Sequence, residues 1–314
     1  MSEVKKIATR ESYGNALTEL GKEHDDVIVL DADLAAATKT GVFKKAFPER
    51  HIDCGIAEAN MMGVAAGIAA TGKVPFASSF AMFAAGRAFE QVRNSIGYPH
   101  LNVKIGATHA GISVGEDGAS HQPIEDIALM RAIPNMTVIG PSDAVSTTFA
   151  VKAAIEHEGP VYLRLGRLNV PVLYDENEEF ELGKGKMLKD GSDVSIIANG
   201  LMVQYALEAA KLLEEEGVNA RVIDIHTVKP IDREIIINAA KETGCIVTAE
   251  EHNVMGGFGS AVAEVVCSEY PVPLKMVGVM DEFGKSGKPD ELFELYGLTA
   301  KNIAAKAIEA IQML

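Results

Sequence analysis

The sequence has no tryptophan, only three cysteines, and far fewer basic than acidic residues. Cys54, Cys245 and Cys267 are an odd number without CxxC or Cys/His spacing, so they predict buried thiols rather than a disulfide framework or a zinc site. Lysine and arginine number 29 against 44 acidic residues, which gives a net charge of −15. This charge argues against a nucleic acid or an anionic membrane as a partner.

Long hydrophobic runs are also missing, since none approaches the roughly 20 residues that a membrane-spanning helix needs. The first residues, MSEVKKIATRESYGNAL, lack the apolar core of a signal peptide. We therefore expect a cytoplasmic protein. Its 314 residues predict two domains, because a domain usually has about 100–200 residues.

Short aliphatic runs alternate with longer helical patterns along the whole chain. Examples are DVIVLDAD, LNVKIGAT, DVSIIANG and CIVTAEE. This alternation predicts the α/β class, with two domains that each contain a mainly parallel sheet flanked by helices. The most polar stretch spans 174–193 and contains three glycines. We therefore expect a first domain at 1–175, a linker at 176–192 and a second domain at 193–314.

The segment HIDCGIAEANMMGVAAGIAATG, residues 51–72, reads as a strand, a turn at Gly55 and a helix. Glu58 lies near the start of this helix among apolar neighbours, so its carboxylate is expected to be poorly hydrated. Such a group can share a proton with a heterocyclic nitrogen. An acidic residue that merely favours the helix N-terminus through the helix dipole is the alternative, and the residues alone leave both open.

The segment THAGISVGEDGASHQPIED, residues 108–126, follows a predicted strand and so lies where open α/β sheets bind ligands. Four polar residues, His109, Glu116, Asp117 and His121, are interspersed with glycines that permit close backbone approach. They are either binding residues or solvated loop residues. The histidines lack the i, i+4 spacing of a zinc motif, so no metal site is expected on this chain.

Phenylalanines cluster in VPFASSFAMFAAGRAFEQVR, residues 74–93, which holds four of the 11 in the chain. Helical core packing accounts for some of them. A flat apolar face is also what a planar pyrimidine ring stacks on.

These segments together resemble the pyrimidine-binding and C-terminal domains of transketolases over essentially the whole chain. The motifs occur in family order: ATR at 8–10, DADL at 31–34, GIAEAN at 55–60, the loop at 108–126, and LGRLNVP at 165–171. The resemblance implies transfer of a two-carbon ketol group from a ketose phosphate to an aldose phosphate, with thiamine diphosphate as cofactor.

The resemblance also assigns roles to residues at matching positions. It implies that Glu58 bonds N1′ of the aminopyrimidine, which promotes loss of the thiazolium C2 proton, and that His121 assists proton movement. The cofactor-binding residues are Asp33, Glu58, Phe80 and Phe83. Arg10, His109 and Arg167 are expected to hold the sugar phosphate, and Asp117 a substrate hydroxyl.

Two departures from the family pattern stand out. Ala37 occupies the place of a serine that often contacts phosphate, and Thr38 or Thr40 is the candidate substitute. The chain also lacks the GDG motif that, with a following asparagine, supplies the Mg²⁺ ligands. We therefore expect Mg²⁺ and the diphosphate to bind an N-terminal transketolase subunit, in an α2β2 assembly.

Two alternatives stay open. One is a related thiamine enzyme, either a 1-deoxyxylulose-5-phosphate synthase or the β subunit of a pyruvate-type dehydrogenase. The other is a non-catalytic subunit that stabilises or regulates a partner.

Overall fold

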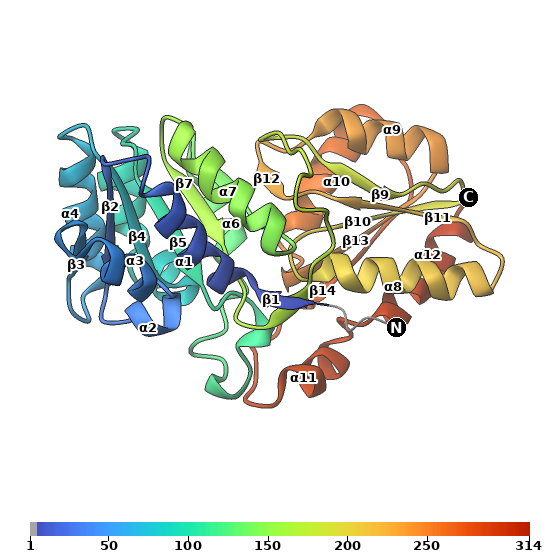
Figure 1. Ribbon diagram of the computed structural model, residues 1–314. Helices are drawn as coiled ribbons and strands as arrows, with labels where there is room; N and C mark the ends of the chain where they lie inside the picture. Colours follow the sequence, from blue (N-terminus) through green and yellow to red (C-terminus); the bar gives the residue numbers. More distant parts are fainter. Residues whose placement is uncertain (1–4) are drawn as a thin grey trace.

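The computed structural model describes residues 5–314, so residues 1–4 of the predicted first domain lie outside the described residues. The chain forms two α/β units that lie side by side (Figure 1), which confirms the predicted fold class. Within residues 5–314, no helix has both the length and the apolar character needed to cross a membrane.

The first unit is built on a seven-stranded sheet. Across the sheet the order is β12 (Thr227–Lys229), β6 (Thr137–Ile139), β7 (Val161–Arg164), β5 (Lys104–Thr108), β4 (Val74–Phe80), β2 (Val27–Asp31) and β3 (His51–Asp53). All neighbours are parallel except β12 and β6. The central strands are buried on both faces, which explains why they read as continuous apolar runs.

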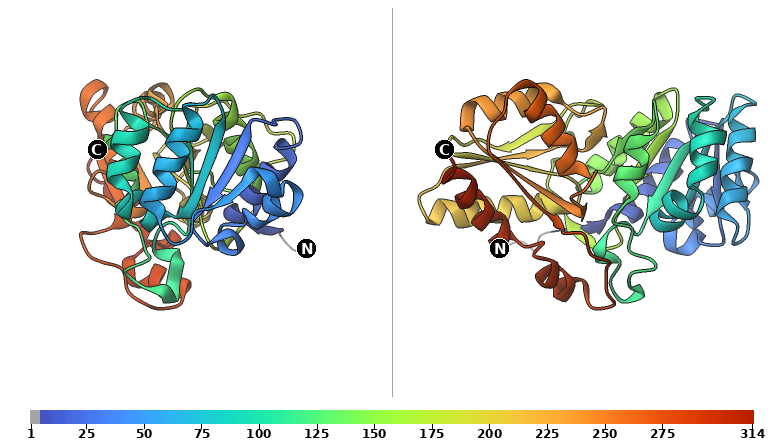
Figure 2. Two further views of the ribbon diagram at one scale, coloured as in Figure 1. Left: turned by 90° about the vertical axis from the view of Figure 1, so that its left-hand side faces the viewer. Right: turned by 180° about the vertical axis from the view of Figure 1, so that it is seen from behind.

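Helices cover both faces of this sheet, as Figure 2 shows. On one face, α1 (Thr9–Leu20) and α7 (Ala144–Glu156) pack with α3 (Gly41–Ala46) around Leu17, Phe76 and Val151. On the other face lie α4 (Glu58–Ala69), α5 (Phe89–Gln91) and α6 (Asp126–Ala132). Between them run two π-helical segments, η2 (Met82–Arg87) and η3 (Val92–Gly97). Such segments occur frequently at functional sites.

The second unit has a five-stranded sheet. Its order is β14 (Leu274–Val279), β13 (Ile246–Asn253), β10 (Val194–Ala198), β11 (Ala220–Asp224) and β9 (Lys186–Lys189). Only the β11 and β9 pair is antiparallel. Strand β9 lies within the stretch 176–192 that the sequence suggested as a linker.

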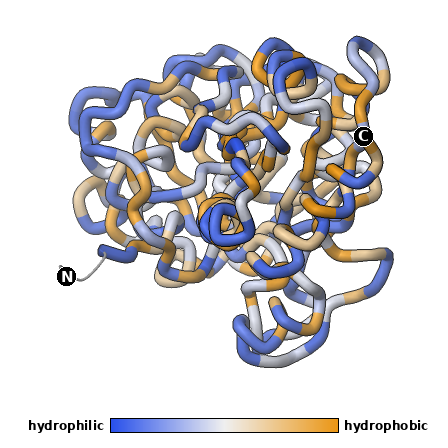
Figure 3. The backbone as a smooth tube through the Cα atoms, turned by 90° about the vertical axis from the view of Figure 1, so that its right-hand side faces the viewer, coloured by the Kyte–Doolittle hydropathy of each residue, from blue (hydrophilic) through white to orange (hydrophobic). Residues whose placement is uncertain are grey.

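Four longer helices cover this second sheet. One face carries α8 (Met202–Glu215) and α12 (Ala300–Ile311), and the other carries α9 (Arg233–Thr243) and α10 (Phe258–Glu269). Figure 3 shows hydrophilic and hydrophobic residues alternating along the outer helices, as expected for helices with one buried face.

The two units are joined by more than the connecting chain. Strand β12 follows β11 in sequence but pairs with β6 of the first sheet. A single hydrophobic cluster includes Ile105 and Met130 of the first unit and Ile225 and Phe258 of the second. Within the first unit, a short two-stranded sheet pairs β1 (Lys6–Ala8), which directly precedes α1, with β8 (Asn169–Pro171). We infer that the units hold a fixed relative position.

One loop of each unit meets at the lower edge of Figure 1. The loop with η4 (Ile112–Asp117) comes from the first unit, and the segment before α11 (Pro289–Tyr296) from the second. Gln122 fastens them, because its Nε2 donates to the carbonyls of Gly115 at 3.0 Å and Lys285 at 2.9 Å.

Candidate active site

The residues predicted from the sequence follow the carboxyl ends of parallel strands. Since these ends meet at one edge of the sheet, residues far apart in sequence are brought together there. Asp33 follows β2, Glu58 follows β3, Phe80 ends β4 and Phe83 follows it, His109 follows β5, and Arg167 follows β7.

Glu58 is the first residue of α4 and its side chain is only 2% exposed. The turn that brings it there uses Gly55, whose φ of 68° suits a residue without a side chain. Oε2 of Glu58 accepts a hydrogen bond of 3.0 Å from Nη1 of Arg87. Arg87 was not predicted from the sequence. Its position four residues after Phe83 in a helical segment was the signal available.

Asp33 lies on the loop beside Glu58 with a φ of 59°, which is uncommon for a residue other than glycine. Asp53 holds this loop in place. Its Oδ1 accepts the backbone N–H of Asp33 at 3.1 Å and that of Gly55 at 2.9 Å. Behind the loop, Oδ2 of the buried Asp31 lies 2.7 Å from Nε2 of His51. These supporting acids were also missed from the sequence.

Two phenylalanines and two histidines form a cluster of rings. Phe80 and Phe83 are stacked with centroids 5.9 Å apart. The ring of His109 stacks on Phe80 at 3.9 Å. His121 meets Phe83 edge-on at 5.2 Å, and its Nδ1 lies 2.9 Å from the hydroxyl of Ser120. The structure therefore brings together rings that the sequence separates by up to 41 positions.

Asp33, Glu58, Phe83 and His121 line one cavity of about 560 Å³. Arg87 lines it as well. A buried carboxylate, an aromatic face and an imidazole around one space are suited to a flat, nitrogen-containing ring.

His109 and Arg10 lie next to this cavity and contact each other. Nη1 of Arg10 is 3.2 Å from Nε2 of His109, and Nδ1 of His109 is 2.9 Å from the hydroxyl of Thr108. Burial lowers the pKa of His109 to about 3, and the charges of Arg10, Arg167 and His121 add to this effect. His109 is therefore neutral near pH 7, with Nε2 accepting from Arg10 and Nδ1–H donating to Thr108.

Arg10 contributes a donor that no protein group uses. Its Nε is buried and has no hydrogen-bond partner among residues 5–314, while Nη1 also donates to the carbonyl of Ala37 at 2.9 Å. Burial, followed by the charge of Arg167, lowers the pKa of Arg10. Two guanidinium groups close enough to repel each other favour a bound anion between them.

Arg167 is held by the loop at 108–126. It donates to the carbonyl of Val114 and lies 3.5 Å from Oε2 of Glu116 and 3.9 Å from Oδ2 of Asp117. The side chain of Asp117 is 47% exposed. The predicted hydroxyl-binding acid and one predicted phosphate ligand are thus adjacent.

Thr38 and Thr40, the candidates to replace the missing serine, are both fully buried. The hydroxyl of Thr38 donates to the carbonyl of Leu34 at 3.0 Å and lies 3.0 Å from the hydroxyl of Thr40. Both hydroxyls therefore already have partners within the protein.

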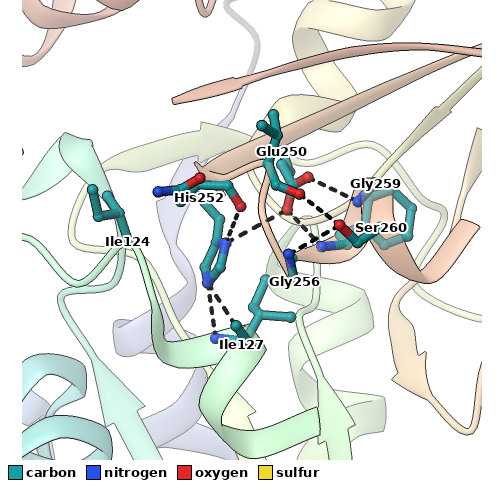
Figure 4. A network of polar contacts seen from close by, with 12 residues as sticks. Ile124, Ile127, Glu250, His252, Gly256, Gly259 and Ser260 are labelled. Atoms are coloured by element: carbon teal, nitrogen blue, oxygen red, sulfur yellow. Dashed lines mark hydrogen bonds and ion pairs between the residues drawn. The ribbon is translucent and has the colours of Figure 1, made fainter. Parts of the chain in front are cut away.

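A polar network at the junction of the two units contacts the start of α6, directly after the loop at 108–126 (Figure 4). Glu250 accepts the N–H groups of Phe258 at 2.6 Å and Gly259 at 2.8 Å, and Nε2 of His252 accepts that of Ile127 at 3.1 Å. Burial raises the pKa of Glu250 to about 7 and lowers that of His252 to about 4. The neutral imidazole can therefore accept a hydrogen bond from the start of α6.

Comparisons with known proteins cover both units. Residues 5–172 match the family described as "Transketolase, pyrimidine binding domain", and residues 183–303 match "Transketolase, C-terminal domain". A putative transketolase C-terminal section from Methanocaldococcus jannaschii is 52% identical over 96% of each chain. A 6-deoxy-6-sulfo-D-fructose transketolase subunit from Clostridium is 46% identical over 96% of this chain and 94% of its own.

The solved structures include one named a split gene transketolase, inactive β4 tetramer. It is 59% identical, covers 98% of this chain and 99% of its own, and has a TM-score of 0.92. Human transketolase is longer: the match, at 40% identity, covers 95% of this chain but 48% of the human protein.

Proposed function

The chain belongs to the transketolase family, and we propose that it is one subunit of a thiamine-diphosphate-dependent transketolase whose other subunit carries the diphosphate site. The observation that carries this proposal is the buried Glu58, which lines the same cavity as Phe83 and His121.

The residues around the cavity fit an aminopyrimidine. A buried carboxylate can bond a ring nitrogen, and the stacked pair Phe80 and Phe83 offers an aromatic surface next to it. Asp33 reaches the cavity from the neighbouring loop. When bound, thiamine diphosphate supplies a thiazolium carbon that adds to a ketose carbonyl and an electron sink that this chain lacks.

Two residues of this chain are proposed to hold and transfer protons. Glu58 exchanges a proton with the pyrimidine ring nitrogen, and the surrounding protein excludes water from that exchange. His121 is half-buried at the cavity wall and is placed to pass a proton to or from the substrate oxygen. The bond to Ser120 fixes the orientation of its ring.

Arg10, His109 and Arg167 are proposed to hold the substrate phosphate. The support is the unpartnered Nε of Arg10 and the proximity of two guanidinium groups in a chain of net charge −15. Asp117, next to Arg167, is proposed to accept a hydroxyl of the sugar. Charge-assisted contacts of this kind orient a phosphorylated sugar along the loop at 108–126.

The Mg²⁺ ligands and the diphosphate site are proposed to lie on an N-terminal transketolase subunit, in an α2β2 complex. Supporting relatives are named a C-terminal section and a transketolase subunit. A structural relative is named an inactive β4 tetramer, so we expect the chain alone to be inactive.

Reconstitution tests the proposal. The purified chain, with thiamine diphosphate and Mg²⁺, should give no ketol transfer, and adding the polypeptide with the diphosphate-binding domain should restore it. Transfer by the chain alone would refute the proposed split of the site. Decarboxylation of pyruvate by the complex, without transfer between sugar phosphates, would instead favour a related thiamine enzyme.

A further inference from the structure

The guanidinium group of Arg87 makes two contacts in the cavity. Nη1 donates to Oε2 of Glu58 at 3.0 Å, and Cζ lies 4.6 Å from the centre of the Phe83 ring, in a cation–π arrangement. The group therefore contacts a carboxylate and an aromatic face at the same time.

These contacts are the ones expected of a bound aminopyrimidine. The guanidinium group and the aminopyrimidine ring are both planar, both present N–H donors or nitrogen atoms to a carboxylate, and both favour an aromatic face. Because Glu58 and Phe83 are the shared partners, a guanidinium and a pyrimidine cannot both make these contacts at once.

We propose that Arg87 occupies the pyrimidine subsite of the unpartnered chain and has to turn away from Glu58 and Phe83 before the cofactor ring binds. The inference rests on the proposed function. It makes Arg87 a positioning residue, because it acts through Glu58 rather than on the substrate.

The exposure of the two side chains makes such a switch feasible. Glu58 is 2% exposed, so without a counter-charge its ionised form would be costly in the unloaded chain. Arg87 is 54% exposed, so its side chain can return to water without leaving a buried charge behind. The pair is partly screened by solvent and is therefore weak enough for a ligand to displace.

The position of Arg87 in the fold also suits this role. It is the last residue of η2, where the helical segment changes character before α5. Within residues 5–314, Glu58 is its only ion-pair partner, so no second acid fixes it in the cavity. Rotation of one side chain is then sufficient to open the subsite.

The test measures binding of the isolated pyrimidine, 4-amino-5-hydroxymethyl-2-methylpyrimidine, to the full chain by calorimetry or ligand-observed NMR, which needs no catalysis. Arg87→Ala should bind this fragment roughly three- to tenfold more tightly than the wild type, since it removes an exposed ion pair and a cation–π contact. Arg87→Lys should fall between the two, because an ammonium cannot lie flat on Phe83.

Three controls test this mechanism. Arg93→Ala removes an exposed arginine of η3 and should leave fragment binding unchanged. Free guanidinium ion should compete with the fragment in Arg87→Ala, where the subsite is open. In the double variant with Glu58→Gln, Arg87→Ala should increase the fragment affinity less, since the carboxylate for which Arg87 and the fragment compete is absent.

The outcomes separate this inference from the proposed function. If the fragment binds and thiamine diphosphate displaces it, but Arg87→Ala binds no better than wild type, Arg87 only supports the structure and the inference is overturned. If no variant binds the fragment, or thiamine diphosphate does not displace it, the cavity is not a pyrimidine subsite, and the proposed function fails with the inference.

Discussion

Nη1 of Arg10 lies 3.2 Å from Nε2 of His109, so two residues proposed to bind the same phosphate already contact each other. The contact makes Nε2 an acceptor and fixes the Nδ1–H tautomer. An anion bound here can take the free Nε–H of Arg10 without breaking this contact, but a hydrogen bond from His109 requires the other tautomer. We therefore expect the two arginines to dominate phosphate binding in this tautomer, while His109 also orients Arg10.

The first prediction concerns the residues proposed to bind the substrate phosphate. In the assembled complex, Arg167→Ala and His109→Ala should raise KM for phosphorylated substrates more than they change kcat. Loss of one hydrogen bond to a charged group costs about 1.5–3 kcal/mol, which is roughly ten- to a hundredfold in affinity. Steady-state kinetics with paired phosphorylated and unphosphorylated donors measures the effect, and equal KM values in wild type and both variants would contradict the assignment.

His109 also gives a pH prediction. Its pKa is lowered to about 3, so the folded protein keeps His109 neutral from pH 5.5 to 8, whereas an ordinary histidine titrates near 6.5. The pH dependence of KM over this range should therefore be the same in wild type and His109→Asn. A wild-type inflection near 6.5 that the variant lacks would show that His109 gains a proton in the complex.

The place of the missing serine allows a second substitution test. The carbonyl of Ala37 faces Arg10, whereas the hydroxyls of Thr38 and Thr40 bond each other. Ala37→Ser should lower KM for sugar phosphates several-fold, because a neutral hydrogen bond contributes about 0.5–1.5 kcal/mol. Thr38→Ala and Thr40→Ala should reduce thermal stability and leave KM unchanged. A raised KM with unchanged stability in either threonine variant would identify that hydroxyl as a phosphate ligand.

A fourth prediction uses Asp224, which is buried between the two units. Its Oδ2 accepts hydroxyl hydrogen bonds from Ser142 at 2.6 Å and Tyr174 at 2.8 Å, and burial raises its pKa to about 7. The unfolded chain loses this proton near pH 4, so the stabilising contribution is complete below that pH and disappears as the pH rises through 7. The wild type should therefore lose stability across this range through Asp224.

Asp224→Asn should remove that component. Relative to wild type, the free energy of unfolding of the variant should improve between pH 4 and 7 by up to a few kcal/mol, at about 1.4 kcal/mol per pH unit. Urea unfolding at several pH values measures the slope. Asp290→Asn, at an exposed position, serves as the control and should run parallel to wild type. Parallel curves for Asp224→Asn would show that Asp224 keeps an ordinary pKa.

The sequence predicted the fold class because the alternation of strands and helices is a local pattern, and α/β units bury strands as continuous apolar runs. Strand β12 could not be predicted in the same way. Its three residues lie within the second unit in sequence, between β11 and α9, but they pair with β6, and only the three-dimensional packing of the units decides this.

The candidate site could be proposed from the sequence where a residue type and its motif predict the chemistry, as for Glu58 and His121, which the structure places around one cavity. Residues that act through another residue gave no such signal. Asp53 holds Asp33 through a backbone N–H, and Arg87 reaches Glu58 across 29 positions. A surface arginine and a loop aspartate are common in any sequence, so only the distances in the folded chain identify them.

The last prediction concerns Glu58 itself. Glu58→Gln should leave assembly and most of the cofactor affinity intact while reducing ketol transfer by a factor on the order of 10²–10⁴, the usual range for a positioned acid–base group. The side chain keeps its size in a site where it is 2% exposed, so packing should survive. An amide can still bond the pyrimidine nitrogen, but it cannot exchange the proton on which the reaction depends.

Hydrogen–deuterium exchange at thiamine C2, at saturating cofactor in the assembled complex, isolates this step from substrate binding. Exchange should be much slower in Glu58→Gln than in wild type, while Glu90→Gln, at an exposed position in α5, should exchange at the wild-type rate. Because the amide also ends the ion pair with Arg87, the double variant with Arg87→Ala should be as slow as Glu58→Gln alone. Equally fast exchange in wild type and Glu58→Gln would mean that Glu58 only places a negative charge at the start of α4.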